Sequence, residues 1–197
     1  GGGDSRGEAS VHPGGLGATP MYAVDDTHIL AARSGDITVF EGEGVEFTRG
    51  TELRLASRAG ADRWWYTYRT ESEAVALGDV VYLLDVEGRV VAVEGYERQR
   101  EDDSGTTLEA RQLWRTAVDG AQSGLATSGA TAYVTTEGGV VAVREGVEQW
   151  RTTLPGTPTT VLATGDGVVV SERRDDRVAR PNWGRAMDRR RRTPRGA

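Results

Sequence analysis

Residues 135–154, TTEGGVVAVREGVEQWRTTL, repeat a pattern that occurs earlier in the chain, in LDVEGRVVAVEG at residues 84–95. In both copies a glycine is followed by one residue and then by Val-Val-Ala-Val. The tripeptide Trp-Arg-Thr follows each copy, beginning at Trp114 and at Trp150. Two copies of one apolar segment, each followed by the same aromatic landmark, indicate an internal structural repeat.

Three landmarks recur in a fixed order along the chain: an alternating apolar segment, a glycine that opens a second strand, and Trp-x-Thr. Trp114 and Trp150 are 36 residues apart, and so are Gly129 and Gly165. Longer units contain polar insertions, which we expect to be lengthened connecting loops at residues 42–62 and 96–112. The landmarks are the segments 23–32, 74–84, 125–136 and 161–171, the glycines Gly35, Gly88 and Gly138, and the tryptophans Trp65, Trp114 and Trp150.

These units are rich in β-branched and aromatic residues, and no long helical stripe of apolar residues interrupts them. Short strands at a regular spacing of this size are typical of β-propeller blades, each with four antiparallel strands. The sequence therefore predicts an all-β fold in which residues 21–172 form an incomplete propeller of about three to four blades. Val-Val-Ala-Val supplies the interior of a blade, with alanine where neighbouring blades approach closely.

The aromatic and glycine landmarks have predicted structural roles. Trp65, Trp114 and Trp150 are expected to dock each blade on the next, because one indole can bury ~150–250 Å². Gly35, Gly88 and Gly138 are expected in hairpin turns that need a positive φ.

Residues 63–70, RWWYTYRT, place Trp64, Tyr66 and Tyr68 on one strand face and Trp65 on the other. The first three are a possible interaction surface for a ligand or peptide. The alternative is that Trp65 docks the blade while the other three cover an interface or the base of a loop.

The repeat resembles the PQQ-like β-propeller family. The resemblance rests on ALGDVVYLLDVEGRVVAVEG with QLWRTAV behind it, and on TSGATAYVTTEGGVVAVREGVEQWRTTL, and it covers roughly residues 21–171. Members include quinone-dependent alcohol dehydrogenases and non-enzymatic scaffolds similar to the outer-membrane assembly lipoprotein BamB. Propellers of this family usually close with seven or eight blades, so the resemblance implies either a piece of a longer protein or assembly with another chain.

The resemblance leaves two functions open. The dehydrogenases carry a pair of adjacent cysteines and a quinone held by calcium, whereas this chain contains no cysteine. Asp25 and Asp26 near His28, and the pair Asp102 and Asp103, lack the spacing of calcium ligands and are expected to be acidic turns. We therefore predict a non-catalytic binding or assembly scaffold without a cofactor or metal, whose partners are proteins or the remaining blades. The alternative is a fragment of a quinone-dependent dehydrogenase whose cofactor residues lie elsewhere.

Charge divides the chain into two parts. Residues 1–172 contain 14 Arg and 27 acidic residues, whereas residues 173–197 contain 10 Arg and 3 Asp, and lysine is absent. The acidic composition is typical of a salt-adapted protein. We expect a flexible Gly-rich segment at residues 1–20 and a tail at residues 173–197 that is disordered or read out of frame. A polyanion contact through the arginines and Trp183 is the remaining interpretation of the tail, and nucleic acid is not an expected partner.

No apolar run reaches the roughly 18 residues that a membrane helix needs, and residues 1–10 show no signal-peptide pattern. The family resemblance alone suggests an extracytoplasmic or membrane-associated location.

Overall fold

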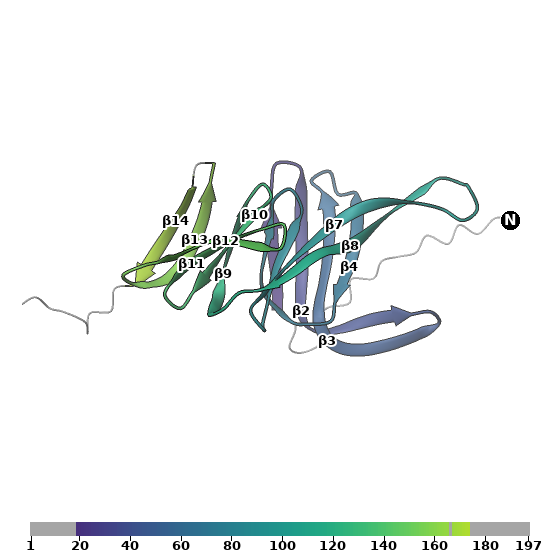
Figure 1. Cartoon of the computed structure of the whole chain (residues 1–197). Coiled ribbons are helices and arrows are strands. Elements are labelled where there is room, and N and C mark those ends of the chain that lie inside the picture. The colour runs from purple at the N-terminus through teal and green to yellow at the C-terminus, as the bar shows by residue number, and fades with distance from the viewer. Residues whose placement is uncertain (1–18, 166, 174–197) are drawn as a thin grey trace, which may run out of the picture.

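The computed structural model describes residues 19–165 and 167–173, and its regular elements are all β-strands (Figure 1). The first sheet contains β1 (Thr19–Val24), β2 (His28–Glu41), β3 (Gly44–Ser57) and β4 (Asp62–Tyr68). The second contains β5 (Ser72–Leu77), β6 (Val81–Asp85), β7 (Arg89–Gln99) and β8 (Thr106–Ala117). The third contains β9 (Ala121–Ser128), β10 (Thr131–Thr136), β11 (Gly139–Arg144) and β12 (Val147–Thr153). A fourth, two-stranded sheet contains β13 (Thr157–Thr164) and β14 (Gly167–Arg173).

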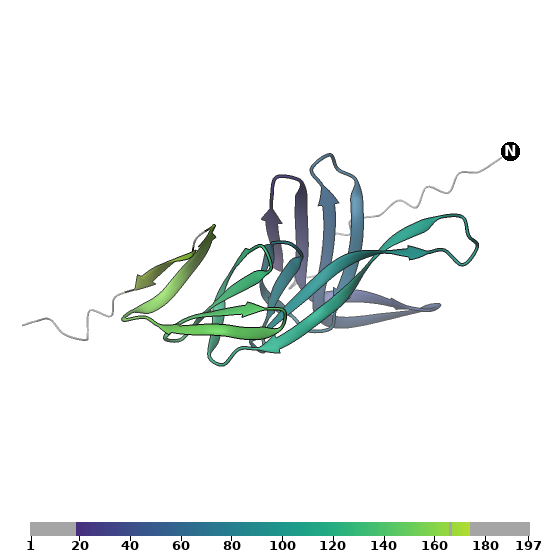
Figure 2. The same cartoon turned by 45° about the horizontal axis from the view of Figure 1, so that its top comes forward.

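Neighbouring strands within each sheet are antiparallel and consecutive in sequence. The first strands of successive sheets contact one another, β1 with β5, β5 with β9, and β9 with β13. Figures 1 and 2 show the sheets following one another in chain order, from β1–β4 at one end to β13–β14 at the other. The prediction of an all-β fold made of antiparallel propeller blades, with three full blades and part of a fourth described, is confirmed.

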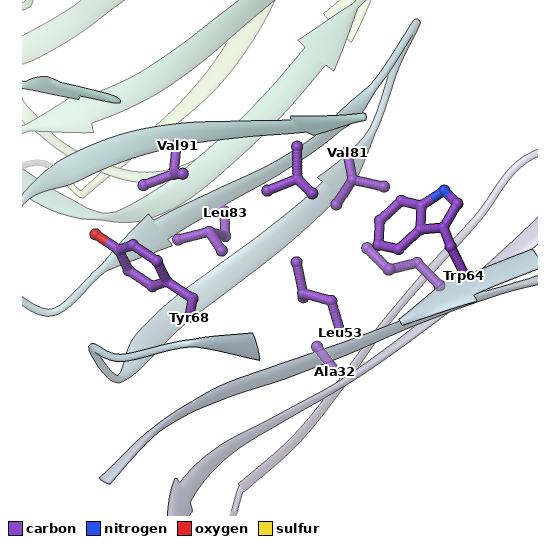
Figure 3. Close-up of a cluster of buried hydrophobic side chains, with 9 residues drawn as sticks. Ala32, Leu53, Trp64, Tyr68, Val81, Leu83 and Val91 are labelled. Atoms are coloured by element: carbon purple, nitrogen blue, oxygen red, sulfur yellow. The ribbon is translucent and has the colours of Figure 1, made fainter. Parts of the chain in front are cut away.

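Two hydrophobic clusters hold the sheets face to face. The first lies between sheets one and two and includes Leu30, Leu53, Trp64, Leu83 and Val91 (Figure 3). The second lies between sheets two and three and is formed mainly by these residues: Tyr82, Leu84, Val90, Ala92, Val134, Val141 and Val143. Because the second sheet contributes to both clusters, β6 is buried along its whole length. A strand covered on both faces is apolar at consecutive positions, which explains Val-Val-Ala-Val.

The two polar insertions are strands rather than loops. In the first sheet, β2 and β3 pair along their full length from His28 to Ser57, and in the second sheet β7 and β8 pair from Arg89 to Ala117. Both hairpins extend beyond the stack of sheets (Figures 1 and 2). Cross-strand hydrogen bonds satisfy the backbone groups that a long loop would leave to water, so the extra residues lengthen existing hairpins.

The three predicted turn glycines are placed differently from one another. Gly88 lies between β6 and β7 with φ at 78°. Gly35 lies inside β2, where it pairs with Gly50 and has φ at 131°. Gly138 lies in the short turn between β10 and β11 but is not among the glycines with positive φ.

The predicted segment 1–20 and the tail 173–197 lie outside the described residues, except that Thr19 and Pro20 begin β1 and Arg173 ends β14. No helix in the described ranges is long and apolar enough to cross a membrane.

Candidate protein-binding surfaces

One tryptophan occupies the same position in each of the three four-stranded sheets. It lies on the outermost strand, in a row of cross-strand partners that begins with an alanine on the first strand. The rows are Ala23, Leu30, Leu55 and Trp64; Ala76, Tyr82, Ala92 and Trp114; and Ala126, Tyr133, Ala142 and Trp150. Each row faces the next sheet along the chain, as the membership of the two clusters shows for the first two.

A β-bulge precedes the tryptophan in every row. The register shifts directly beside the partner of Trp64, of Trp114 and of Trp150. A bulge adds one residue to a strand and changes which face the following side chains occupy. The repeated bulge therefore sets the same orientation for all three indoles.

A glycine from the next sheet lies against the first two of these indoles. A Cβ atom added to Gly95 of β7 would lie 2.5 Å from Cδ1 of Trp64. A Cβ atom added to Gly146, in the turn between β11 and β12, would lie 3.3 Å from Cβ of Trp114, and Thr116 donates a hydrogen bond to the Gly146 carbonyl at 2.6 Å. Sequence reasoning missed both glycines, although Glu-Gly after each Val-Val-Ala-Val segment was a usable signal.

In the first sheet the docking residue is Trp64 and not the predicted Trp65. Trp64 is 4% exposed within the cluster between sheets one and two, and Tyr66 and Tyr68 pack there with it. Trp65 points to the opposite face and is 48% exposed, under the guanidinium of Arg54 at 5.0 Å. Trp64, Tyr66 and Tyr68 thus cover an interface between blades, and the docking position of this sheet belongs to Trp64.

A buried polar group joins the first two sheets beside this cluster. Asp85 is 1% exposed and accepts hydrogen bonds from the Tyr68 hydroxyl and from Nε of Arg89, both at 2.7 Å. Backbone N–H groups of Glu87 and Arg89 donate to its other oxygen. Burial, together with the hydrogen bond to Asp85, raises the pKa of Tyr68. The donors to Asp85 are Glu87 and Arg89, close to it in sequence, and Tyr68 of the first sheet, so Asp85 links the two sheets and has a structural role.

Exposed apolar side chains gather on the open face of the first sheet, the face turned away from the second sheet. This face carries Tyr22, Val24, Ile29 and Trp65. Tyr22 is 70% exposed, and its row of cross-strand partners runs through Ala31 and Arg54 to Trp65. Arg54 is held by Asp62, with Nη2 to Oδ1 at 2.6 Å. Tyr22, Val24 and Ile29 lie together on β1 and β2, and Trp65 lies on β4 across the same face. Exposed apolar side chains on one face of a sheet make a surface of the kind that proteins use to bind other proteins.

The acidic residues predicted to lie in turns do so, and some of them line a groove. A groove of about 360 Å³ lies between the first two sheets and includes Asp25, Trp64 and Asp79. Asp25 accepts hydrogen bonds from the backbone N–H groups of Thr27 and His28. Asp102 lies in the turn between β7 and β8, where it accepts hydrogen bonds from Ser104. Across the part of the chain that the structure describes, no three His, Cys, Asp or Glu side chains are grouped to hold a metal ion.

No protein-family model matches this sequence, and a search of curated proteins gives no match. Among solved structures, the chain is similar to the crystal structure of BamB from Moraxella catarrhalis, with 16% sequence identity and a TM-score of 0.43. The similarity covers 77% of this chain and 54% of that BamB chain, so the chain spans about half the length of the protein it matches.

Proposed function

We propose that this protein is a non-catalytic scaffold that binds another protein through the open face of the first sheet. The observation that carries the proposal is the patch formed by Tyr22, Val24, Ile29 and Trp65. The propeller-like fold supports it, because stacked sheets present rigid surfaces without requiring a catalytic centre.

The chemistry of the face indicates what a partner must present. Burying apolar surface contributes roughly 25 cal/mol per Å², and Trp and Tyr are enriched among the residues that dominate binding energies. The partner surface is therefore apolar and flat enough to cover a sheet. Arg54 lies within this face over the indole of Trp65 and is already paired with Asp62, so it can be covered without an acidic group from the partner.

Site-specific photocrosslinking in the source cells tests this proposal. A photoreactive phenylalanine analogue at Tyr22 is expected to give a discrete crosslinked species that Val24→Asp abolishes. The matched control carries the analogue at Gln112, an exposed position on β8 of the second sheet, and is expected to give no such species. Equal crosslinking at both positions would contradict the assigned face. Oxidation of an alcohol by the purified chain with a quinone and calcium would contradict a non-catalytic role.

A further inference from the structure

The fourth sheet has an edge that no described strand covers. It contains β13 and β14, whereas each of the other sheets contains four strands. β14 pairs with β13 on one side, and within the described ranges no strand pairs with its other edge. An uncovered edge presents a row of backbone donors and acceptors to which another strand can add.

Trp150 is exposed beside this incomplete sheet. It holds the same row position as Trp64 and Trp114 and stacks on Tyr133 at 5.9 Å between ring centroids, yet it is 43% exposed. Gly95 and Gly146, which lie against the other two indoles, belong to the third strand of the next sheet or to the turn that follows it. The feature that would cover Trp150 is therefore a third and fourth strand added to β14, with a glycine near the turn.

The hairpin at residues 36–49, here called the ribbon, is a pair of strands that could add to the edge of β14. β1 pairs with β2 only up to Ser34, and β4 pairs with β3 only from Thr51 onward. Both outer edges of the ribbon therefore pair with no other described strand. Its arms are comparable in length to β11, with six residues, and to β14, with seven.

One face of the ribbon carries exposed apolar side chains toward its tip. Phe40 is 76% exposed and Phe47 is 81% exposed, and exposed Val45 is the cross-strand partner of Phe40. The opposite face is tied to the first sheet, because Arg69 forms ion pairs with Glu41 and with Glu46. Arg49, at the base of the aromatic face, pairs with Asp36 and Glu71, so ion pairs hold both faces while Phe40 and Phe47 stay exposed toward the tip.

The tip of the ribbon also shares its sequence with the turn that covers Trp114. Residues 43–46 and residues 145–148 both read Glu-Gly-Val-Glu, with the glycines at Gly44 and Gly146. Gly146 is the residue that lies against Trp114. The tetrapeptide is placed differently in the two hairpins, because Gly44 begins β3 as the partner of Glu41, whereas Gly146 lies in its turn with φ at 78°. The glycine with positive φ in the turn of the ribbon is Gly42, at 59°.

We propose that the ribbon of one copy of this chain adds to β14 of a second copy, completes its fourth sheet and covers its Trp150. Gly42, in the turn of the ribbon, then takes the position against Trp150 that Gly146 takes against Trp114, and the Phe40 and Phe47 side chains pack on the exposed indole. Donor and acceptor are different surfaces, so the contact is heterologous and each copy can both give and receive a ribbon. The partner is a second copy and the surface differs from the open face of the first sheet, so this inference stands apart from the proposed function.

Sedimentation velocity on the full chain tests the inference. The wild-type chain is expected to associate as its concentration rises to about 200 µM. Phe40→Ser with Phe47→Ser removes the donor, Trp150→Ala removes the acceptor, and each is expected to weaken association about tenfold or more. Leu108→Ser with Leu113→Ser is the matched control, since it removes exposed apolar side chains of β8, outside both surfaces, and is expected to leave association unchanged.

Mixing the two defective variants gives the sharper result. The donor-defective copy keeps an intact acceptor and the acceptor-defective copy keeps an intact ribbon, so the mixture is expected to form one-to-one dimers and nothing larger. Monomeric wild-type chain over the whole range would overturn the inference, and this is also the result if residues that follow β14 fill the site themselves. A mixture that stays monomeric, or a control that dissociates with the others, would overturn it as well.

A disulfide test does not depend on the stability of the Trp150 variant. The chain contains no cysteine, so Glu43→Cys in one copy and Gln149→Cys in another are the only thiols present. Mild oxidation of the mixture is expected to give a heterodimer in several-fold excess over homodimers. A statistical mixture of the three possible dimers would contradict the assigned contact.

Discussion

Trp64 and Trp65 are adjacent in the sequence but lie on opposite faces of the first sheet. Trp64 packs with Leu53 and Val81 between two sheets (Figure 3). Its pyrrole atoms Cδ1 and Nε1 are the atoms nearest to a Cβ added at Gly95. Trp65 contacts Arg54 at the surface. Because side chains alternate along a strand, a shift of one residue moves a tryptophan from the interface to solvent.

The two tryptophans consequently form a matched pair for measuring the docking contribution. Trp64→Ala is expected to lower the free energy of unfolding by about 3–5 kcal/mol, because it removes a buried ring and leaves a cavity. Trp65→Ala is expected to cost less than about 1 kcal/mol, since the ring is half exposed. Urea denaturation of both variants measures the difference. Equal losses, or a larger loss for Trp65→Ala, would contradict the assigned positions.

Tyr82 makes stability depend on pH in the alkaline range. Burial, with a smaller contribution from the Asp79 carboxylate, raises the pKa of Tyr82 from 10.0 to about 12. Above pH 10 the unfolded chain releases this proton while the folded chain retains it. The stabilisation is therefore complete below pH 10 and is lost as the pH rises to about 12, at up to about 1.4 kcal/mol per pH unit.

Denaturation of the wild type and of Tyr82→Phe at several pH values between 9 and about 12 measures this contribution. The phenylalanine variant lacks the titrating group and is expected to show a shallower decline. Parallel curves for the two proteins would show that the Tyr82 hydroxyl is not buried as described.

At the scale of the element, the hairpin of β11 and β12 requires glycine at Gly139 but not at the neighbouring Gly138. A Cβ atom added to Gly139 would lie 1.7 Å from the carbonyl oxygen of Thr152 on the paired strand. A Cβ atom added to Gly138 would meet nothing within 4 Å. The close approach of the two backbones at Gly139 leaves no room for a side chain.

Gly139→Ala is therefore expected to destabilise the protein by about 1–3 kcal/mol, because the two strands must separate locally. Gly138→Ala is the control and is expected to change stability by less than about 0.5 kcal/mol. Thermal unfolding followed by circular dichroism compares them. A neutral Gly139→Ala would contradict the pairing of β11 with β12 at this point.

The sequence predicts the elements well where both faces of a strand are buried. Val-Val-Ala-Val in β7 and β11 identifies these strands because a doubly covered strand must be apolar at every position. The long hairpins were wrongly expected to be loops, since their polar side chains face solvent while cross-strand bonds keep them extended. Gly35 resembles a turn residue in spacing alone, and the Trp-x-Thr spacing selects Trp65 because the bulge before Trp64 cannot be seen in the sequence.

At the scale of the whole molecule, the middle of the stack is held most firmly. β6 and β11 are buried on both faces, whereas β12 is exposed along its whole length and the fourth sheet has two strands among the described residues. The hydrogen bond between Tyr68 and Asp85 and the two hydrophobic clusters join the first three sheets. Stability is therefore expected to decrease from the second sheet toward the fourth sheet and the ribbon.

Hydrogen exchange followed by mass spectrometry measures this gradient. Amides of β6, β7, β10 and β11 are expected to exchange slowest, and those of β14 and of the ribbon at low protein concentration fastest. Uniform protection across all the sheets would contradict a stack whose ends are open.

The central claim is that one indole of the first sheet and one of the second each dock on a glycine of the next sheet. Nuclear Overhauser effects between tryptophan ring protons and glycine α protons, in protein labelled only at these two residue types, test it directly. The account predicts cross-peaks from Trp64 to Gly95 and from Trp114 to Gly146, and none from Trp65 to Gly95. Cross-peaks between Trp65 and Gly95, or none from Trp64 and Trp114 to these glycines, would contradict it.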